Sequence, residues 1–295
     1  MKKYFYAFLL SCFLMHSAFA DISKEEKSAL IDLYTATNGS HWTKKWDMDE
    51  PVSQWFGIKV IDDKVVEISL FRNNLQGPLP ESIGKLENLQ VLNLAFNKIT
   101  GTIPSELAKL VNLKVLKLEM NRIKGSLPED IGNMVGLEEF TAFNNFITGT
   151  IPGSIGEIKS LRVLNLSSNN LKGEIPDSLG SLGSLESLGL FENGLEGSIP
   201  REMGALTNLK ELVLANNQLG GAIPKEFGQL ASLRVLQIQN NKFDSFKNLQ
   251  YLDTKGMLVL DFDKGNEKLD FKDIDFSKTR MADTKFEEGV DDDNE

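Results

Sequence analysis

The sequence predicts an α/β solenoid, which is a stack of similar units whose strands form one parallel β-sheet. Asparagine recurs every 24 residues, at Asn73, Asn97, Asn121, Asn145, Asn169, Asn193, Asn217 and Asn241. Seven of the nine prolines, from Pro80 to Pro224, recur at the same interval. A spacing kept this strictly indicates that one supersecondary unit is copied and stacked, so each unit buries its apolar side against its neighbours.

Each unit contains a stretch whose apolar residues alternate with a period of two, which is typical of a strand. In the second unit this alternation points Leu92 and Leu94 inward and Val91, Asn93 and Ala95 outward. The recurring asparagine follows, where the chain leaves the strand. Because its amide both donates and accepts hydrogen bonds, we expect it to satisfy backbone groups that the turn leaves unpaired inside.

The segment 89–110 reads L-x-x-L-x-L-x-x-N-x-I-x-G-x-I-P-x-x-L-x-x-L. This pattern resembles the leucine-rich repeat, in the subtype of plant receptors and polygalacturonase inhibitors. The resemblance covers eight repeats over about residues 65–248. It implies a right-handed superhelix with the parallel sheet on its concave face, an N-terminal helical cap and a β-type C-terminal cap.

Residues 1–20 have the pattern of a secretory signal peptide. Lys2 and Lys3 precede the apolar run from Tyr4 to Met15, and the small residues Ala18 and Ala20 follow. The alternative is a lipoprotein signal with a lipidated Cys12, which the continuing apolar run disfavours. We therefore expect an exported protein that is secreted, periplasmic or held at the cell surface.

Composition limits the classes of partner. Removal of the signal would take away two lysines and no acid, so the formal net charge would change from −10 to −12. An acidic chain without a basic run is a poor nucleic-acid binder. No other segment is long and apolar enough to span a membrane. We expect a monomer without a cofactor.

Residues 21–64 are predicted to form the N-terminal cap. Ser23 and Glu26 have the spacing of a capping box at the start of a helix. The three tryptophans, Trp42, Trp46 and Trp55, follow this helix. Their expected role is to cover the first repeat, and the alternative is a site that stacks on sugars. The segment 53–60 resembles the cap of extracellular leucine-rich repeat proteins, with Ser53 and Val60 at the cysteine positions, as in bacterial relatives.

The C-terminal region, 249–288, departs from the repeat. Met257, Leu260 and Phe262 keep the register and predict a ninth strand near 257–263. A period of five over 269–288 resembles four pentapeptide repeats, and this segment is either a lid on the last strand or, alternatively, a frayed tail or an amphipathic helix. Residues 289–295 are acidic and expected to be disordered. Calcium binding by Asp291–Asp293 is a weak hypothesis, because the run lacks the spacing of a known loop.

The outward positions of the predicted sheet contain aromatic and charged residues that are typical of a protein-binding patch. The column two residues before the asparagines includes Phe71, Glu119, Phe143 and Phe191, and the next column includes Arg72, Phe96, Met120 and Glu192. The candidate partner-binding residues are Phe71, Phe96, Lys117, Glu119, Met120, Glu139, Phe143, Phe191 and Glu192. The alternative is that the rings only cover neighbouring strands.

The fourth repeat has Phe140 and Ala142 where its neighbours have leucine. Such a large-for-small exchange between adjacent inward positions conserves core volume. We interpret it as a repacked core that also tilts Phe143 outward.

These observations favour a non-catalytic scaffold that binds a protein or peptide on its concave face. The alternative is a carbohydrate-binding or surface-adhesion protein. An enzyme is the weakest hypothesis. His41 is the only histidine beyond the signal, no Cys or His set for zinc follows it, and nothing marks Glu138 and Glu139 as an acid/base pair.

Overall fold

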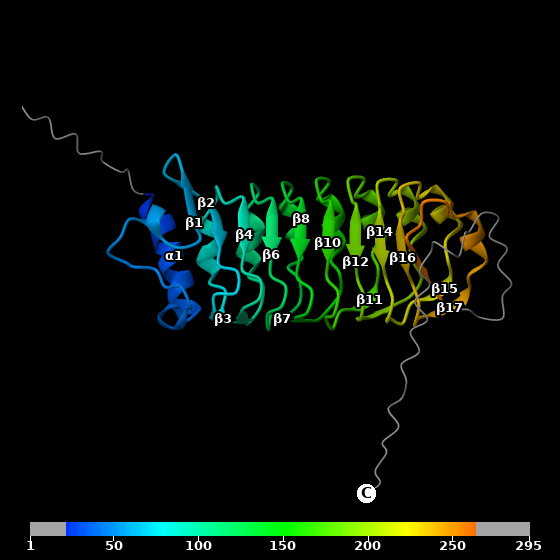
Figure 1. Ribbon diagram of the computed structural model, residues 1–295, viewed down its shortest axis with the longest axis horizontal. Coiled ribbons are helices and arrows are strands. Elements are labelled where there is room, and N and C mark those ends of the chain that lie inside the picture. The colour runs from blue at the N-terminus through cyan, green and yellow to red at the C-terminus, as the bar shows by residue number, and fades with distance from the viewer. Residues whose placement is uncertain (1–21, 264–295) are drawn as a thin grey trace, which may run out of the picture.

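Strands from successive repeats lie side by side in one ten-stranded sheet that runs along the molecule (Figure 1). The computed structural model describes residues 22–263. The strand order is β1-β2-β4-β6-β8-β10-β12-β14-β16-β18. All neighbours are parallel except β1, which pairs antiparallel with β2. In each parallel pair of this sheet the paired residues are 24 apart in the sequence, such as Leu92 and Leu116. The strand register therefore equals the sequence period.

The strands of this sheet are short. They are β1 (Ile58–Ile61), β2 (Lys64–Ser69), β4 (Val91–Asn93), β6 (Val115–Lys117), β8 (Glu139–Thr141), β10 (Val163–Asn165), β12 (Ser187–Gly189), β14 (Glu211–Val213), β16 (Val235–Gln237) and β18 (Val259–Asp261). Thus β18 is the ninth parallel strand predicted near 257–263. The antiparallel β1 was not predicted.

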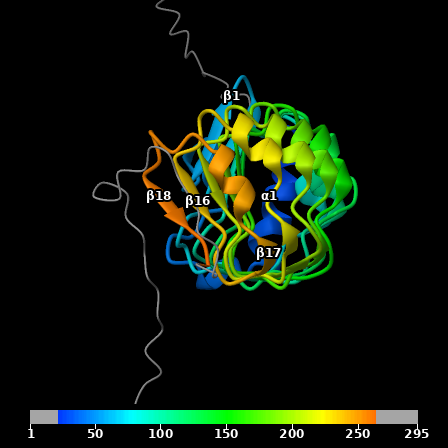
Figure 2. The ribbon, with the colours of Figure 1, turned by 90° about the vertical axis from the view of Figure 1, so that its right-hand side faces the viewer.

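Each repeat continues into a second short strand and a 3₁₀ helix. The second strands pair as β3 (Gln76–Pro78) with β5 (Lys98–Thr100), β7 (Lys124–Gly125) with β9 (Phe146–Ile147), β11 (Lys172–Glu174) with β13 (Gly194–Glu196), and β15 (Gly220–Ala222) with β17 (Lys242–Ser245). The 3₁₀ helices of the repeats are η3 (Glu81–Lys85), η4 (Ser105–Lys109), η5 (Ile131–Asn133), η6 (Gly153–Glu157), η7 (Asp177–Ser181), η8 (Arg201–Ala205), η9 (Lys225–Gln229) and η10 (Lys247–Tyr251). Seen along the stack, these helices lie opposite the long sheet (Figure 2).

The recurring asparagines form a continuous hydrogen-bonded ladder between the repeats. Asn121 is typical: its Nδ2 donates to the carbonyl oxygens of Leu118 (3.0 Å), Glu119 (3.3 Å) and Leu94 (3.0 Å). Its Oδ1 accepts from the N–H of Ile99 at 3.0 Å. The side chain is only 8% exposed, so these bonds replace water for four backbone groups inside the turn. The predicted structural role of the ladder is confirmed.

Glycine and proline shape the opposite side of each repeat. Gly101 has φ of +76°. Glycine adopts this left-handed conformation at a lower energy than a residue with a Cβ atom does. Pro104 keeps an extended backbone at φ −68° directly before η4. A glycine with positive φ recurs in the first seven repeats, from Gly77 to Gly221, and a proline directly precedes the 3₁₀ helix in six of them.

At the N-terminal end, the helix α1 (Lys24–Ala36) packs against η3 and β3 of the first repeat. Ser23 Oγ caps it by accepting from the N–H of Glu26 at 3.1 Å. The buried carboxylate of Glu26 accepts from Ser23 Oγ at 3.1 Å and from the N–H of Val65 at 3.2 Å. The bond from Val65 fastens the helix to β2. The short helices η1 (Gly39–His41) and η2 (Val52–Gln54) complete this end.

The three tryptophans are buried beside α1, with exposed fractions between 2% and 4%. Trp46 is the centre of the group: its ring lies 4.9 Å from Trp42, 4.7 Å from Trp55 and 5.8 Å from Tyr34. Each indole N–H donates to a backbone carbonyl at 2.8–3.1 Å. The tryptophans therefore pack at the end of the stack, and the alternative sugar-stacking role for them is wrong because their faces are covered.

The fourth repeat has the predicted exchange in its core. Phe140 and Ala142 are both fully buried, in line with leucine pairs of the neighbouring repeats. Phe143, which follows, is half-buried, and Phe146 on β9 is 55% exposed.

Beyond Asn241 the geometry of the repeat continues through β17, η10 and β18, although the Gly-x-Ile-Pro residues are absent. Phe246 takes the place of proline, and its ring lies 5.9 Å from Phe243 and 5.4 Å from Phe262. The signal segment 1–20, Cys12, the period-five segment 269–288, the tail 289–295 and Asp291–Asp293 lie outside the described residues.

Candidate ligand-binding face

The side of the ten-stranded sheet that faces away from the core is called the sheet face below. Side chains alternate between the two sides of each strand, so the first and third residues of a three-residue strand face outward. Across the sheet these positions form two columns at the centre of the sheet face. The first column contains Glu67, Val91, Val115, Glu139, Val163, Ser187, Glu211, Val235 and Val259. The second contains Ser69, Asn93, Lys117, Thr141, Asn165, Gly189, Val213, Gln237 and Asp261. The centre of the face is thus a stripe of mixed apolar, polar and charged side chains.

The column two residues before each asparagine is less exposed than the alternation predicts. Ala95 and Ala215 are buried, and Glu119 is only 9% exposed. Ala95 and Glu119 were expected to point outward, and they are little exposed because the strands end at the second column and the chain is already turning there. In this column Phe71 is 49% exposed, whereas Phe143 and Phe191 are half-buried.

The residue directly before each asparagine has a left-handed backbone in all eight repeats, with φ between 49° and 59°. These residues are Arg72, Phe96, Met120, Asn144, Ser168, Glu192, Asn216 and Asn240. Asparagine adopts this region readily, whereas a bulky residue does so at a cost of about 1–2 kcal/mol. Phe96 and Met120 therefore occupy positions where asparagine would favour folding.

The structure brings only part of the predicted aromatic patch together. The rings of Phe71 and Phe96 lie 5.2 Å apart with their planes tilted by 58°, and both are largely exposed. Within the described part of the chain, Phe143 and Phe191 contact no other aromatic ring. Met120 is half-buried, and its sulfur lies 2.9 Å from Nδ2 of Asn144. The exposed aromatic site is thus a pair at the N-terminal end of the sheet face.

Each of the predicted charged residues has a polar partner in the structure. Lys117 Nζ pairs with Glu139 Oε1 at 2.8 Å across β6 and β8. The carboxylate of Glu119 accepts from Thr141 Oγ1, in the second column, at 2.6 Å. Glu192 accepts from the hydroxyl of Ser168 at 2.7 Å. Glu119 was expected to ring the patch with charge, and its exposed fraction is only 9%.

An open hollow of about 420 Å³ adjoins the aromatic pair. Its lining residues are Thr43, Arg72, Asn74, Phe96, Asn97 and Lys98. Of these, only Phe96 was among the predicted site residues. Arg72 and Lys98 were missed as a pair because they occupy different positions of two repeats: Arg72 directly precedes its asparagine, and Lys98 directly follows its own. Asn74 also directly follows its asparagine. Comparing the residues that follow the asparagines would therefore have placed Lys98 beside Asn74.

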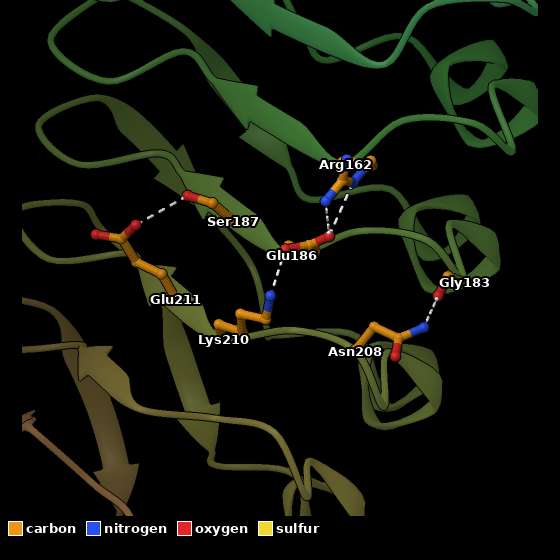
Figure 3. A network of polar contacts seen from close by, with 7 residues as sticks. All are labelled: Arg162, Gly183, Glu186, Ser187, Asn208, Lys210 and Glu211. Carbon is orange, nitrogen blue, oxygen red and sulfur yellow. Dashed lines mark hydrogen bonds and ion pairs between the residues drawn. The ribbon is translucent and has the colours of Figure 1, made fainter.

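A second polar feature lies at the start of the strands, where Glu186 bridges two cations (Figure 3). Its carboxylate binds Lys210 Nζ through one oxygen and the Arg162 guanidinium, with Nε at 2.8 Å, through the other. Between β12 and β14, the hydroxyl of Ser187 donates to Oε2 of Glu211 at 3.0 Å. Hydrogen bonds from Lys210 and then from Arg162 lower the pKa of Glu186, and the bond to Glu186 raises the pKa of Arg162.

We expect Glu186→Gln to lower stability slightly near neutral pH, since the network is exposed and screened by salt. The folded-state pKa of Glu186 lies below its ordinary value of 4.5. Its contribution is therefore fully present above that value and is lost as the pH falls through the folded-state pKa. Thermal unfolding of Glu186→Gln and of the exposed control Glu157→Gln, measured from neutral to acidic pH, checks this. A difference between the variants that grows on acidification would contradict it.

Catalytic and metal-binding groups are scarce in residues 22–263. No group of three or more His, Cys, Asp or Glu in this range is placed to hold a metal ion. His41 is exposed and its Nδ1 lies 2.9 Å from Asn38 Oδ1 in the end region. None of the described helices is long and apolar enough to cross a membrane.

A stacked parallel sheet with an asparagine ladder defines the class of protein, and comparison with known families agrees. The profile "Leucine-rich repeat region" matches residues 142–251, and the profile "Leucine rich repeat" matches residues 63–123. Together they match more than half of the 295 residues. The chain belongs to the leucine-rich repeat family, and its repeats are of the plant type.

Several solved structures share this fold. PEPR1-AtPEP1 is 31% identical with a TM-score of 0.71, and the match covers 80% of this chain and 35% of that chain. The ectodomain of the receptor kinase GASSHO1/SCHENGEN3 from Arabidopsis thaliana, in complex with CASPARIAN STRIP INTEGRITY FACTOR 2, is 28% identical with a TM-score of 0.65, over 79% of this chain and 32% of that chain. A leucine-rich repeat protein of Leptospira interrogans is 34% identical with a TM-score of 0.56, over 65% and 47%.

This chain therefore spans about a third of the two plant proteins and about half of the Leptospira protein. A comparison with curated protein sequences finds no significant match.

Proposed function

We propose that this chain is an exported, non-catalytic scaffold that binds a protein or peptide partner on its sheet face. The observation that carries the proposal is the Phe71–Phe96 pair. Both rings are more than 40% exposed, and Phe96 holds the left-handed backbone that asparagine holds in three other repeats. A residue kept at a cost to folding and presented to solvent is typical of a binding site.

The similar structures support a peptide as the ligand. The GASSHO1/SCHENGEN3 ectodomain is in complex with CASPARIAN STRIP INTEGRITY FACTOR 2, and the Arabidopsis receptor kinase HAESA is in complex with the peptide hormone IDA. Parallel strands also suit an extended ligand, because their side chains form columns at a spacing of about 4.8 Å. A peptide laid across the strands meets the same positions of successive repeats.

The test uses residues 21–295 as the immobilised target, selects peptides that bind it from a displayed random library, and then measures Kd for the selected peptides. We expect Phe71→Ala combined with Phe96→Asn to weaken binding by roughly 30-fold, since aromatic hot spots contribute about 2 kcal/mol or more. Asparagine suits the backbone at position 96, so the fold should be kept.

The matched control is Phe146→Ala, which removes a ring that is 55% exposed on β9, away from the sheet face. Its Kd should stay within about twofold of wild type, which is a free-energy difference below about 0.5 kcal/mol. Equal losses in both variants, or none in either, would place the site elsewhere.

The alternative is carbohydrate binding or adhesion through exposed aromatic and short polar side chains. A glycan array with the same protein separates the two functions. Strong saccharide binding that depends on Phe71 and Phe96, together with no peptide selection, would favour the alternative.

A further inference from the structure

The hollow beside the aromatic pair contains two cations that have no carboxylate partner among residues 22–263. None of its six lining residues is acidic. Within residues 22–263, the guanidinium of Arg72 makes no hydrogen bond or ion pair. Lys98 Nζ donates to the neutral amide oxygen of Asn74 at 2.9 Å, and Asn74 Nδ2 in turn donates to the carbonyl of His41 at 2.8 Å. An amide oxygen orients the ammonium group without cancelling its charge.

This arrangement is confined to the N-terminal end of the stack. At the register of Arg72 the last five repeats have Asn144, Ser168, Glu192, Asn216 and Asn240. At the register of Lys98, the sixth and seventh repeats have Gly194 and Gln218. Elsewhere on the sheet face and its edges, Lys117, Arg162 and Lys210 have carboxylate partners, whereas Lys242 donates to a neutral amide oxygen as Lys98 does. Two unneutralised cations beside two exposed rings are thus a local departure in a chain with a net charge of −10.

We propose that this hollow binds a carboxylate side chain of an acidic peptide segment, with a neighbouring apolar side chain of the peptide against Phe71 and Phe96. A guanidinium and an ammonium at the wall of an open hollow attract an anion, and Arg72 can bind a carboxylate through two N–H donors. The rings are tilted by 58° and form a wedge, which accommodates an apolar side chain better than the flat face of a sugar ring. This inference rests on the proposed peptide function and specifies its ligand.

The other repeats provide templates for testing the hollow without unfolding it. Glu192 has the same backbone conformation as Arg72, with φ of 53° against 49°, so Arg72→Glu has a precedent within this chain. Gln218 occupies the register of Lys98, so Lys98→Gln has one as well. The matched control is Lys242→Gln: Lys242 shares this register and donates to Gln218 Oε1 at 3.1 Å, in a repeat far from the hollow.

The experiment selects displayed random peptides separately on wild type and on Arg72→Glu. We expect aspartate or glutamate next to an apolar residue to be enriched on wild type, and this enrichment to be lost on the variant. For a labelled peptide from the wild-type selection, Kd should rise roughly tenfold with Arg72→Glu and roughly threefold with Lys98→Gln, and should not change with Lys242→Gln. Raising the salt concentration should weaken binding to wild type more than to Arg72→Glu.

Each other outcome overturns the proposal in a recognisable way. Selected peptides without acidic enrichment, whose Kd depends on Phe71 and Phe96 but not on Arg72, would sink the acidic ligand and leave the peptide function standing. The absence of any selected peptide would overturn both. Tight binding of oligogalacturonate with no acidic peptide would assign the hollow to a sugar acid. Binding that appears only after removal of residues 286–295 would identify the chain's own acidic segment as the occupant.

Discussion

Asn121→Ala is expected to lower the free energy of unfolding by about 3 kcal/mol, the upper end of the range for buried polar groups left without a partner. The substitution removes the partner of three carbonyl groups and one N–H, all inside a turn that water reaches poorly. Chemical denaturation measures the loss. Amide exchange gives a local check, because the N–H of Ile99 donates to Asn121 and should exchange faster in the variant.

The control is Asn170→Ala, which removes an exposed asparagine next to the ladder residue Asn169. A substitution on the surface should change stability by less than about 0.5 kcal/mol. Similar losses in Asn121→Ala and Asn170→Ala would mean that the ladder does not stabilise the stack.

Trp46→Ala is expected to be the most disruptive change at the N-terminal end, with a loss of about 3–5 kcal/mol. Trp46 is 4% exposed and touches the rings of Tyr34, Trp42 and Trp55. Its loss opens a cavity among these rings and leaves the carbonyl of Phe56 without its indole donor. Thermal unfolding and near-ultraviolet circular dichroism measure the effect.

Phe56→Ala is the matched control, since this ring is 38% exposed on the same end of the molecule and lies under the ammonium of Lys44. Its expected loss is about 1 kcal/mol or less. If Trp46→Ala were as mild as Phe56→Ala, the tryptophan cluster would not stabilise the end of the stack.

Much of the fold follows from the 24-residue period, because each repeat packs only against its neighbours. Residues in the same register therefore have the same surroundings, and Leu92 predicts the burial of Leu116 and Leu164. The strand β1 was not predicted, since 58–61 lies before the first repeat and no register applies to it.

The candidate site was predicted less completely than the fold. Period-two alternation holds only while the strand lasts, and the strands are three residues long in most repeats. For this reason the alternation predicts the exposure of Phe71 and Phe96 but not the low exposure of Glu119. The hollow depends on how Arg72 of one repeat meets Lys98 of the next, and this meeting is decided by packing between repeats.

The most direct test of the account is a photo-crosslink between the sheet face and a selected peptide. A benzophenone side chain placed at Asn93, on the sheet face beside the first repeat, should crosslink the labelled peptide in high yield. The same group placed at Phe146 on β9 should not. The account predicts crosslinking at position 93 that disappears with Phe71→Ala and Phe96→Asn. Crosslinking at position 146 but not at position 93 would contradict it.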